Sequence, residues 1–100
     1  MRSLSAMMRA DARLAILQAL SEDRGYSLNH MMLREFVDRA AAITLCEDEV
    51  REHLSWLEDR GAVTTESVPP FLIAKLTNYG LGLARGHNTL DGVSRPLPEG

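Results

Sequence analysis

The apolar periodicity of the chain changes at Gly61, and this change most restricts the folds open to it. Before Gly61, apolar residues recur every three or four positions, which predicts amphipathic helices. After it, residues 62–66 and 71–76 form two short apolar runs that contain β-branched residues, typical of strands. Val68-Pro69-Pro70 lies between them and predicts a turn, because proline cannot donate a ladder hydrogen bond. We therefore expect helices followed by a β-hairpin.

Three helices are expected before the hairpin and one after it. The first is expected at 6–21, with Ser5 or Ser3 as its cap, and the second begins between residues 27 and 29. A short extended piece is expected at 43–45. The third helix has the clearest start, because Thr44 and Glu47 fit a capping box, and a later start with Cys46 at the cap is the alternative.

The third helix should end at Gly61, in the position that needs a positive φ. A last helix is expected at 78–85, capped by Thr77 and packed on the body through its apolar side chains. This order of elements predicts a mainly α fold with a small β-hairpin, the winged helix-turn-helix. Its nominal recognition helix is the third, and its wing tip is 66–71.

The 100 residues are enough for one domain, and 45% hydrophobic with 25% charged residues is an ordinary globular composition. We expect the winged helix domain at 1–86 and a flexible C-terminal tail at 87–100, where Gly, Asn, Pro and Ser accumulate. One cysteine excludes an internal disulfide and a cysteine-rich zinc site. No apolar run approaches a membrane span and no signal peptide is recognisable, so we expect a cytoplasmic protein without a membrane partner.

Several segments resemble a known family. Leu57-Glu58-Asp59-Arg60-Gly61-Ala62-Val63 is similar to the junction between recognition helix and wing in regulators of the ArsR and MarR type. In order along the chain, residues 13–17, 25–29, 50–57, 76–81 and 92–96 resemble small proteins of Mu-like bacteriophages and prophages. The resemblance implies a winged helix, a phage or prophage origin and therefore the cytoplasm of a bacterial host. It also admits a homodimer, because many winged helix regulators dimerise.

The charge distribution argues against generic DNA binding. Residues 44–60 carry six acidic and two basic side chains, a formal charge of −4 in a chain of −3 overall. A recognition helix enters the major groove between two rows of phosphates, so this acid lies where DNA would have to come. The wing tip 66–71 contains no Lys or Arg. Any binding to double-stranded DNA is therefore expected to be weak or to depend on a specific sequence.

Two functions follow from these observations. The first is a phage-encoded helix-turn-helix protein, nominally DNA-binding or a transcription regulator. The second is a winged helix adaptor in phage replication, packaging or assembly, whose acidic third helix binds a basic protein. The residues expected to contact DNA or a partner are Thr44, Cys46, Glu47, Arg51, His53 and Ser55 on the exposed side of the third helix, with Arg34 and Lys75 on phosphates.

The remaining candidates have ordinary structural interpretations. We expect His53 to form a solvated surface pair with Glu49, and Cys46 to be a half-buried structural residue. Four methionines, Met7, Met8, Met31 and Met32, are expected mostly as core filler, and the first two could instead pack on a second copy. Trp56 is either a partial core residue or an interface anchor. No metal, no cofactor and no enzymatic activity are expected, because no phosphate loop, nucleophile motif or metal spacing occurs.

Overall fold

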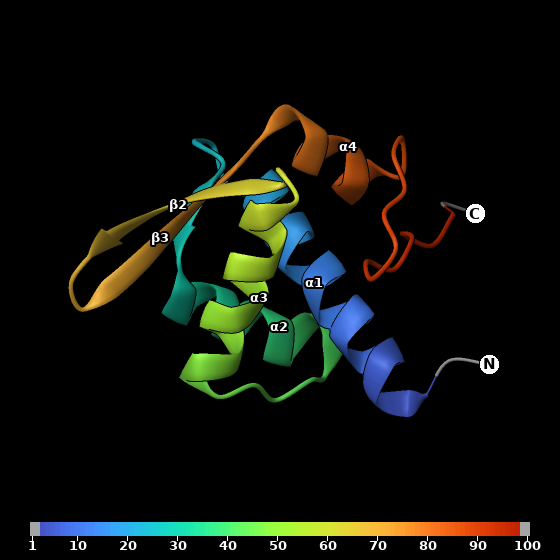
Figure 1. Cartoon of the computed structure of the whole chain (residues 1–100), viewed down its shortest axis with the longest axis horizontal. Coiled ribbons are helices and arrows are strands. Elements are labelled where there is room, and N and C mark those ends of the chain that lie inside the picture. Colours follow the sequence, from blue (N-terminus) through green and yellow to red (C-terminus); the bar gives the residue numbers. More distant parts are fainter. Residues whose placement is uncertain (1–2, 99–100) are drawn as a thin grey trace.

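The computed structural model describes residues 3–98, which form four α-helices and a small three-stranded antiparallel sheet. The elements are α1 (Leu4–Glu22), β1 (Ser27–Asn29), α2 (His30–Ala41), α3 (Glu47–Asp59), β2 (Val63–Val68), β3 (Phe71–Leu76) and α4 (Asn78–Arg85). Figure 1 shows α1, α2 and α3 packed together, with the β2–β3 hairpin projecting from one side of the helices. The expected helices and hairpin are therefore present.

The third strand differs from expectation. The sheet order is β1-β3-β2, with β3 in the centre. Strand β1 is the edge strand that the sequence did not predict, and it pairs Ser27 with Lys75 and Asn29 with Ile73. The extended piece expected at 43–45 is not a strand. Its alternating pattern has another cause, because Ile43 and Leu45 are both buried and anchor the loop between α2 and α3 in the core.

Helix α3 begins at the later of the two expected positions. Cys46 is its N-cap, and the Cys46 backbone N–H donates to the Glu49 carboxylate at 3.0 Å. This hydrogen bond lowers the pKa of Glu49. Cys46 at the N-cap and Glu49 at the third helical position form the capping box. The box therefore begins two residues after the expected start at Thr44. At the other end Gly61 has φ +78°, which confirms the expected terminator.

The apolar stripes of the helices meet in one core. Its largest fully buried members include Ile16, Leu17, Leu20, Leu33, Val37, Val50, Leu54, Leu57 and Leu83. The four methionines do not join this core. Met7, Met8, Met31 and Met32 are 36–50% exposed, so the prediction that they fill the core is wrong. They lie off the buried stripes of their helices, where the core is already filled by leucine and valine.

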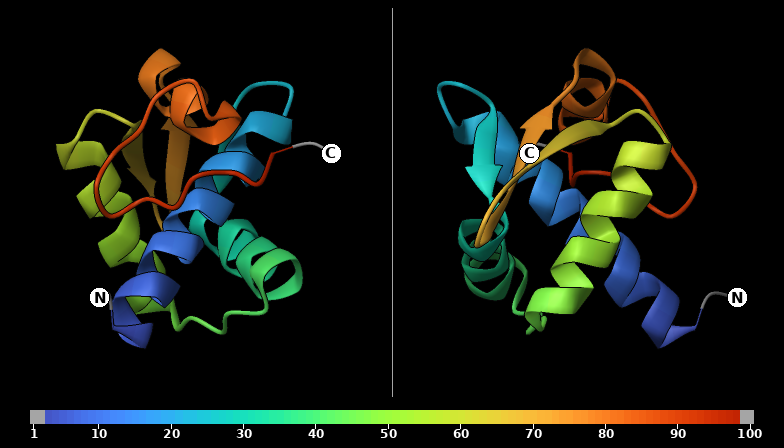
Figure 2. Two further views of the ribbon diagram at one scale, coloured as in Figure 1. Left: turned by 90° about the vertical axis from the view of Figure 1, so that its right-hand side faces the viewer. Right: turned by 60° about the vertical axis from the view of Figure 1, so that its left-hand side comes forward.

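The segment that follows α4 crosses the surface of α1 (Figure 2). Val93 is buried, and the Ser94 backbone N–H donates to the Ala10 carbonyl at 3.1 Å. The Ser94 hydroxyl also hydrogen-bonds Asp11. The tail at 87–100 is thus attached through 92–94, where a valine is available to bury. The mobility of the whole tail in solution stays a prediction.

Candidate interaction surface

The outward face of α3 carries a row of mostly acidic side chains. Asp48, Glu52, Ser55 and Asp59 recur at steps of four, three and four residues, and all four are exposed. On the opposite face Leu54 packs into the core. We call Asp48, Glu52 and Asp59 the acidic stripe. Its carboxylates are presented to solvent because the helix must point its apolar side inward.

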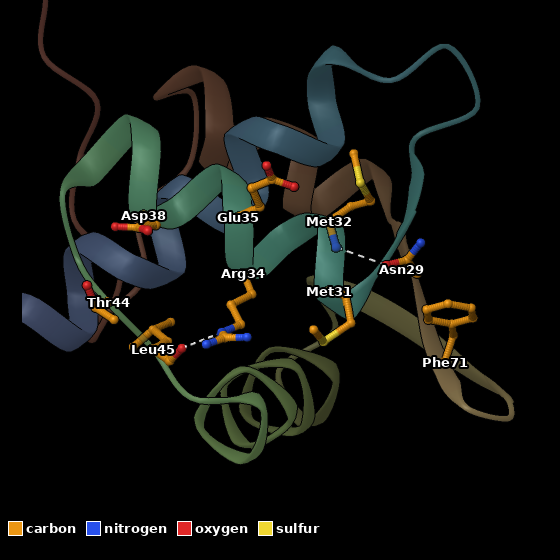
Figure 3. Close-up of a pocket in the computed structure, with 9 residues that line it drawn as sticks. All are labelled: Asn29, Met31, Met32, Arg34, Glu35, Asp38, Thr44, Leu45 and Phe71. Carbon is orange, nitrogen blue, oxygen red and sulfur yellow. Dashed lines mark hydrogen bonds between the residues drawn. The ribbon is translucent and has the colours of Figure 1, made fainter.

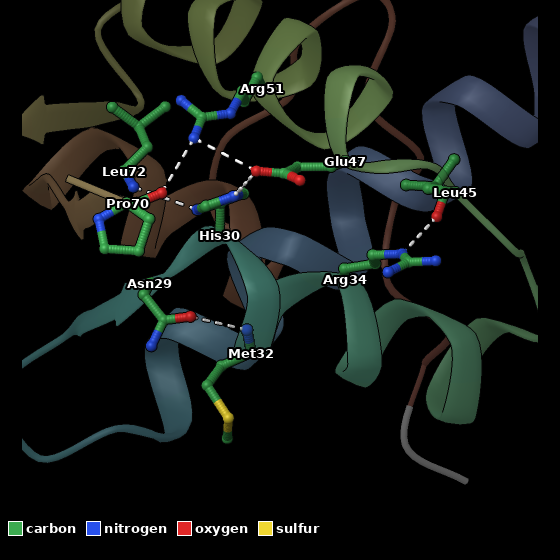
Figure 4. A network of polar contacts seen from close by, with 9 residues as sticks. All are labelled: Asn29, His30, Met32, Arg34, Leu45, Glu47, Arg51, Pro70 and Leu72. Atoms are coloured by element: carbon green, nitrogen blue, oxygen red, sulfur yellow. Dashed lines mark hydrogen bonds and ion pairs between the residues drawn. The ribbon is translucent and has the colours of Figure 1, made fainter. Parts of the chain in front are cut away.

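A polar network joins the start of α3 to α2 and to the β2–β3 hairpin (Figure 4). His30 is fully buried, and its Nε2 lies 2.8 Å from Oε1 of Glu47. The Leu72 backbone N–H donates to His30 Nδ1 at 3.1 Å. Because Nδ1 accepts this bond, the ring is the neutral tautomer with its hydrogen on Nε2. The Nε2–H group then donates a hydrogen bond to Glu47.

Arg51 completes this network at the turn of the hairpin. Its Nη2 donates to Glu47 at 3.3 Å and to the Pro70 carbonyl at 3.2 Å. The hydrogen bond from His30, and then that from Arg51, lowers the pKa of the Glu47 carboxyl. Glu47 and Arg51, both predicted to contact DNA or a partner, therefore hold the β2–β3 hairpin against α2 and α3.

His53 is not on the exposed side of α3, contrary to the prediction. It is 7% exposed, and its Nδ1 accepts a hydrogen bond from Arg13 Nε at 3.2 Å. Burial, followed by the positive charge of Arg13, lowers the pKa of His53 to about 4. The ring is neutral at pH 7. Helical spacing put His53 near Glu49, but the ring is buried beside Arg13 of α1.

Trp56 lies between two guanidinium groups. Arg13 sits 3.8 Å and Arg60 3.7 Å from the centroid of the ring, as in cation–π stacks. Arg13 also donates to the Gly92 carbonyl at 3.0 Å. Trp56 is half-buried as part of this stack, which favours the structural one of its two interpretations. The stack also places Arg60, one of the two bases of 44–60, against the indole.

The other predicted contact residues do not form a cluster around α3. Thr44, Cys46 and Ser55 are exposed, and Lys75 is exposed on β3 opposite Thr64 and Ser27. The prediction that Cys46 is half-buried is therefore wrong, because the N-cap position leaves its side chain at the surface. Arg34, predicted to contact phosphate, instead donates from Nε to the Leu45 carbonyl at 2.7 Å. This bond pins the α2–α3 loop, since Leu45 is itself held in the core.

The structure contains a groove that the sequence analysis did not anticipate. It has a volume of about 540 Å³ and lies beside α2, the α2–α3 loop and the β2–β3 hairpin (Figure 3). Its apolar lining includes Met31, Met32 and Phe71, and its polar lining includes Arg34, Glu35 and Asp38. We call it the methionine groove. The signal in the sequence was Met31 and Met32 beside the Leu33 stripe, an apolar surplus that one helix face could not bury.

A smaller hollow of about 340 Å³ lies between the start of α1 and the same loop. Leu4, Met8, Ile43 and His53 are among its lining residues. Within residues 3–98 no group of three or more His, Cys, Asp or Glu side chains is arranged to hold a metal ion. No helix in that range is long and apolar enough to cross a membrane.

Comparison with known proteins identifies relatives over nearly the whole chain. No family model matches the sequence. The chain is 32% identical over 95 residues to protein gp26 of Escherichia phage Mu, which covers 95% of this chain and 97% of gp26. It belongs to the gp26 family. A Haemophilus influenzae protein is 34% identical over 80 residues, or 79% of this chain and 76% of that protein.

The gp26 relationship confirms the resemblance to Mu-like phage proteins. Both relatives are described as uncharacterised proteins, so membership of the gp26 family carries no biochemical activity with it. The function must therefore be argued from the surface of this chain.

Proposed function

We propose that this gp26-family protein is a winged helix module whose α3 face binds a protein, not a DNA duplex. The order α1-β1-α2-α3-β2-β3 and the sheet order β1-β3-β2 support the winged helix assignment, with β2 and β3 as the wing. Fold alone leaves the ligand open, because helix-turn-helix scaffolds carry different surfaces. The ligand class comes from the charge on those surfaces.

The observation that carries the choice is the acidic stripe. In a duplex complex the outward face of the recognition helix lies between two rows of phosphates. Here that face presents Asp48, Glu52 and Asp59. Carboxylates held near phosphates repel them. They also release no counterions from the DNA, so the favourable free energy that cationic proteins gain from this release is absent. A basic protein surface would instead be attracted.

Acidic side chains outnumber basic ones by six to two within 44–60, and the cations near α3 are already held by contacts within the protein. Arg51 is bonded to Glu47 and to the wing, Arg34 to the Leu45 carbonyl, and Arg60 is stacked on Trp56. The wing tip offers Val68 and Phe71, which are 48% and 40% exposed, where a DNA-binding wing would present Lys or Arg. Apolar side chains at a wing tip suit contact with a protein.

The proposed role is binding without catalysis, as an adaptor in phage replication, packaging or assembly in the cytoplasm of the host. A homodimer is compatible with this role. Sequence-specific reading of a duplex is the second candidate, and the exposure of Thr44, Cys46, Ser55 and Lys75 favours it. In that case these four residues would make the contacts.

Fluorescence anisotropy with a labelled random duplex tests the proposal. Because the recognition face is acidic, we expect a dissociation constant near or above ~10⁻⁴ M at physiological salt. Selection from a random duplex library should recover no consensus sequence. Micromolar binding that weakens steeply with added salt, or a selected consensus, would instead establish duplex binding.

A matched pair of charge reversals locates any residual binding. Glu52→Lys changes the acidic stripe, and Glu22→Lys makes the same charge change at an exposed position at the end of α1. We expect both variants to change duplex affinity equally, as a net-charge effect does. A gain confined to Glu52→Lys would mean that α3 faces DNA. Glu47 and Glu49 are unsuitable for this test, because they hold the wing network and the helix cap.

A further inference from the structure

The methionine groove exposes three large apolar side chains at one place. Met31, Met32 and Phe71 are 36%, 50% and 40% exposed and line the same groove (Figure 3). Leaving such side chains in water forgoes about 25 cal/mol for each Å² of apolar surface. Exposed Val68 pairs with Phe71 across the hairpin, so the apolar surface continues onto the wing tip.

The groove has the length and the lining of a helix-binding site. Met31, Arg34 and Asp38 follow one another along α2 at steps of three and four residues, so the groove extends over about two helical turns, or ~10 Å. A partner helix presents apolar anchors at the same spacing. Methionine suits such contacts, because its unbranched thioether adapts to the shape of the partner.

The charges around the groove specify the partner further. Three charged side chains line the groove, Glu35 and Asp38 with negative charge and Arg34 with positive charge. Within the described residues the Asp38 carboxylate has no hydrogen bond or ion pair. The nearby cations are engaged, since Arg34 binds the Leu45 carbonyl and Arg39 pairs with Glu35 at 2.7 Å. Arg34 keeps its charge in its bond to Leu45, so one positive and two negative side chains give the groove lining a formal charge of −1.

We propose that the methionine groove binds the apolar face of an amphipathic helix of a partner protein whose flanking residues are Lys and Arg. The inference rests on the proposed protein-binding function and adds the position and the chemistry of the partner. The apolar anchors would contact Met31, Met32 and Phe71, and a basic flank would meet Asp38. A duplex meets neither requirement, because it offers no apolar anchors and repels the carboxylates.

The probe is a synthetic amphipathic peptide of leucine and lysine at helical spacing, compared with a peptide that has glutamate in place of lysine. We expect the lysine peptide to bind at least about tenfold more tightly by anisotropy, because only its charge complements the carboxylates. NMR of methionine methyl groups reports the position. The methyls of Met31 and Met32 should shift on binding, and those of Met7 and Met8 should not.

Two matched substitutions test the groove itself. Met32→Lys places a cation in the groove, and Met7→Lys makes the same change at a methionine of equal exposure on α1, 49% against 50%. We expect Met32→Lys to weaken binding of the lysine peptide by about tenfold, and Met7→Lys to change it by less than about twofold. Asp38→Lys should also weaken binding. Unchanged circular dichroism spectra exclude unfolding as the cause.

Failure of this inference and failure of the proposed function give different results. No binding of the lysine peptide, equal binding of both peptides, or shifts at Met7 and Met8 alone would overturn the groove assignment. In that case weak, unspecific duplex binding would leave the proposed function intact. Tight duplex binding would overturn the proposed function, and binding of the lysine peptide at Met32 would then still stand.

Discussion

The two histidines at the core boundary show how much a side chain's role depends on its surroundings. His30 is satisfied on both ring nitrogens, by Glu47 and by the Leu72 N–H. His53 accepts one bond from a positively charged donor, Arg13. A proton on His53 would have to sit beside that guanidinium in a buried place, which is why its pKa falls to about 4.

The lowered pKa of His53 predicts a stability loss in mild acid. The unfolded chain takes up a proton near pH 6.5, whereas the folded chain does so only near pH 4, so stability is lost as the pH falls through this window. Allowing for partial solvent screening, the loss is about 2 kcal/mol. His53→Gln keeps an acceptor for Arg13 and should flatten the change in unfolding free energy measured by urea denaturation. His87→Gln, at an exposed histidine, should leave the change as in the wild type.

At the scale of elements, the β2–β3 hairpin is held by side chains that complete its hydrogen-bond ladder. Strand β1 pairs with β3 as far as Ile73, and the ring of His30 then accepts the next amide of β3, that of Leu72. Arg51 holds the turn through the Pro70 carbonyl. The hairpin is therefore attached to both α2 and α3.

Removal of the His30 ring should loosen the wing. His30→Phe keeps an aromatic ring but leaves the Leu72 N–H without its acceptor and Glu47 without its donor, so we expect the unfolding free energy to fall by about 2 kcal/mol. Hydrogen exchange should accelerate at the amides of 66–72. His87→Phe serves as the exposed control. Unchanged exchange at 66–72 in His30→Phe would show that the hairpin is held by its own pairing alone.

Element boundaries show what pattern alone could and could not provide. The stripe through Leu33 and Val37 and the terminator Gly61 were predictable, because each depends on local periodicity or on one φ angle. The strand β1 was not, because Ser27–Asn29 has no strand pattern and pairs only because β3 offers a free edge. The segment 43–45 had that pattern without a strand to pair with.

At the scale of the whole molecule, the segment after α4 packs against α1, so the C-terminal part of the chain contacts the first helix. Arg13 on α1 is the centre of this contact, since it reaches His53, Trp56 and the Gly92 carbonyl. Residues 92–94 then cover α1 (Figure 2). These residues are distant in sequence, so no local rule joins them.

Gly92→Ala tests whether this attachment persists in solution. Gly92 has φ +92°, and a Cβ there would lie 2.7 Å from Cζ2 of Trp56. We expect a loss of about 1–2 kcal/mol in unfolding free energy, from backbone strain and this overlap. Gly25→Ala, where a Cβ meets only an ordinary contact, is the control. Equal stability of Gly92→Ala and the wild type would instead support the flexible tail expected from its composition.

The candidate site divides in the same way between sequence and packing. The exposed acidic side chains of α3 were predictable from its local composition. The charged residues of an amphipathic helix face water when its apolar stripe is buried. The roles of Glu47, Arg51 and His53 were not, since each is set by a neighbour from another element: His30, the wing turn and Arg13. The methionine groove likewise exists only where α2, the loop and the wing meet.

By itself, the sequence determined the helices, the hairpin, the position of the turn and the negative charge of α3, because these follow from periodicity, from single special residues and from local composition. Tertiary structure alone decided the third strand, which charged residues stay free, and where apolar surface remains open. Those outcomes depend on the partner that each group meets in space, and chains of similar local pattern can meet different partners.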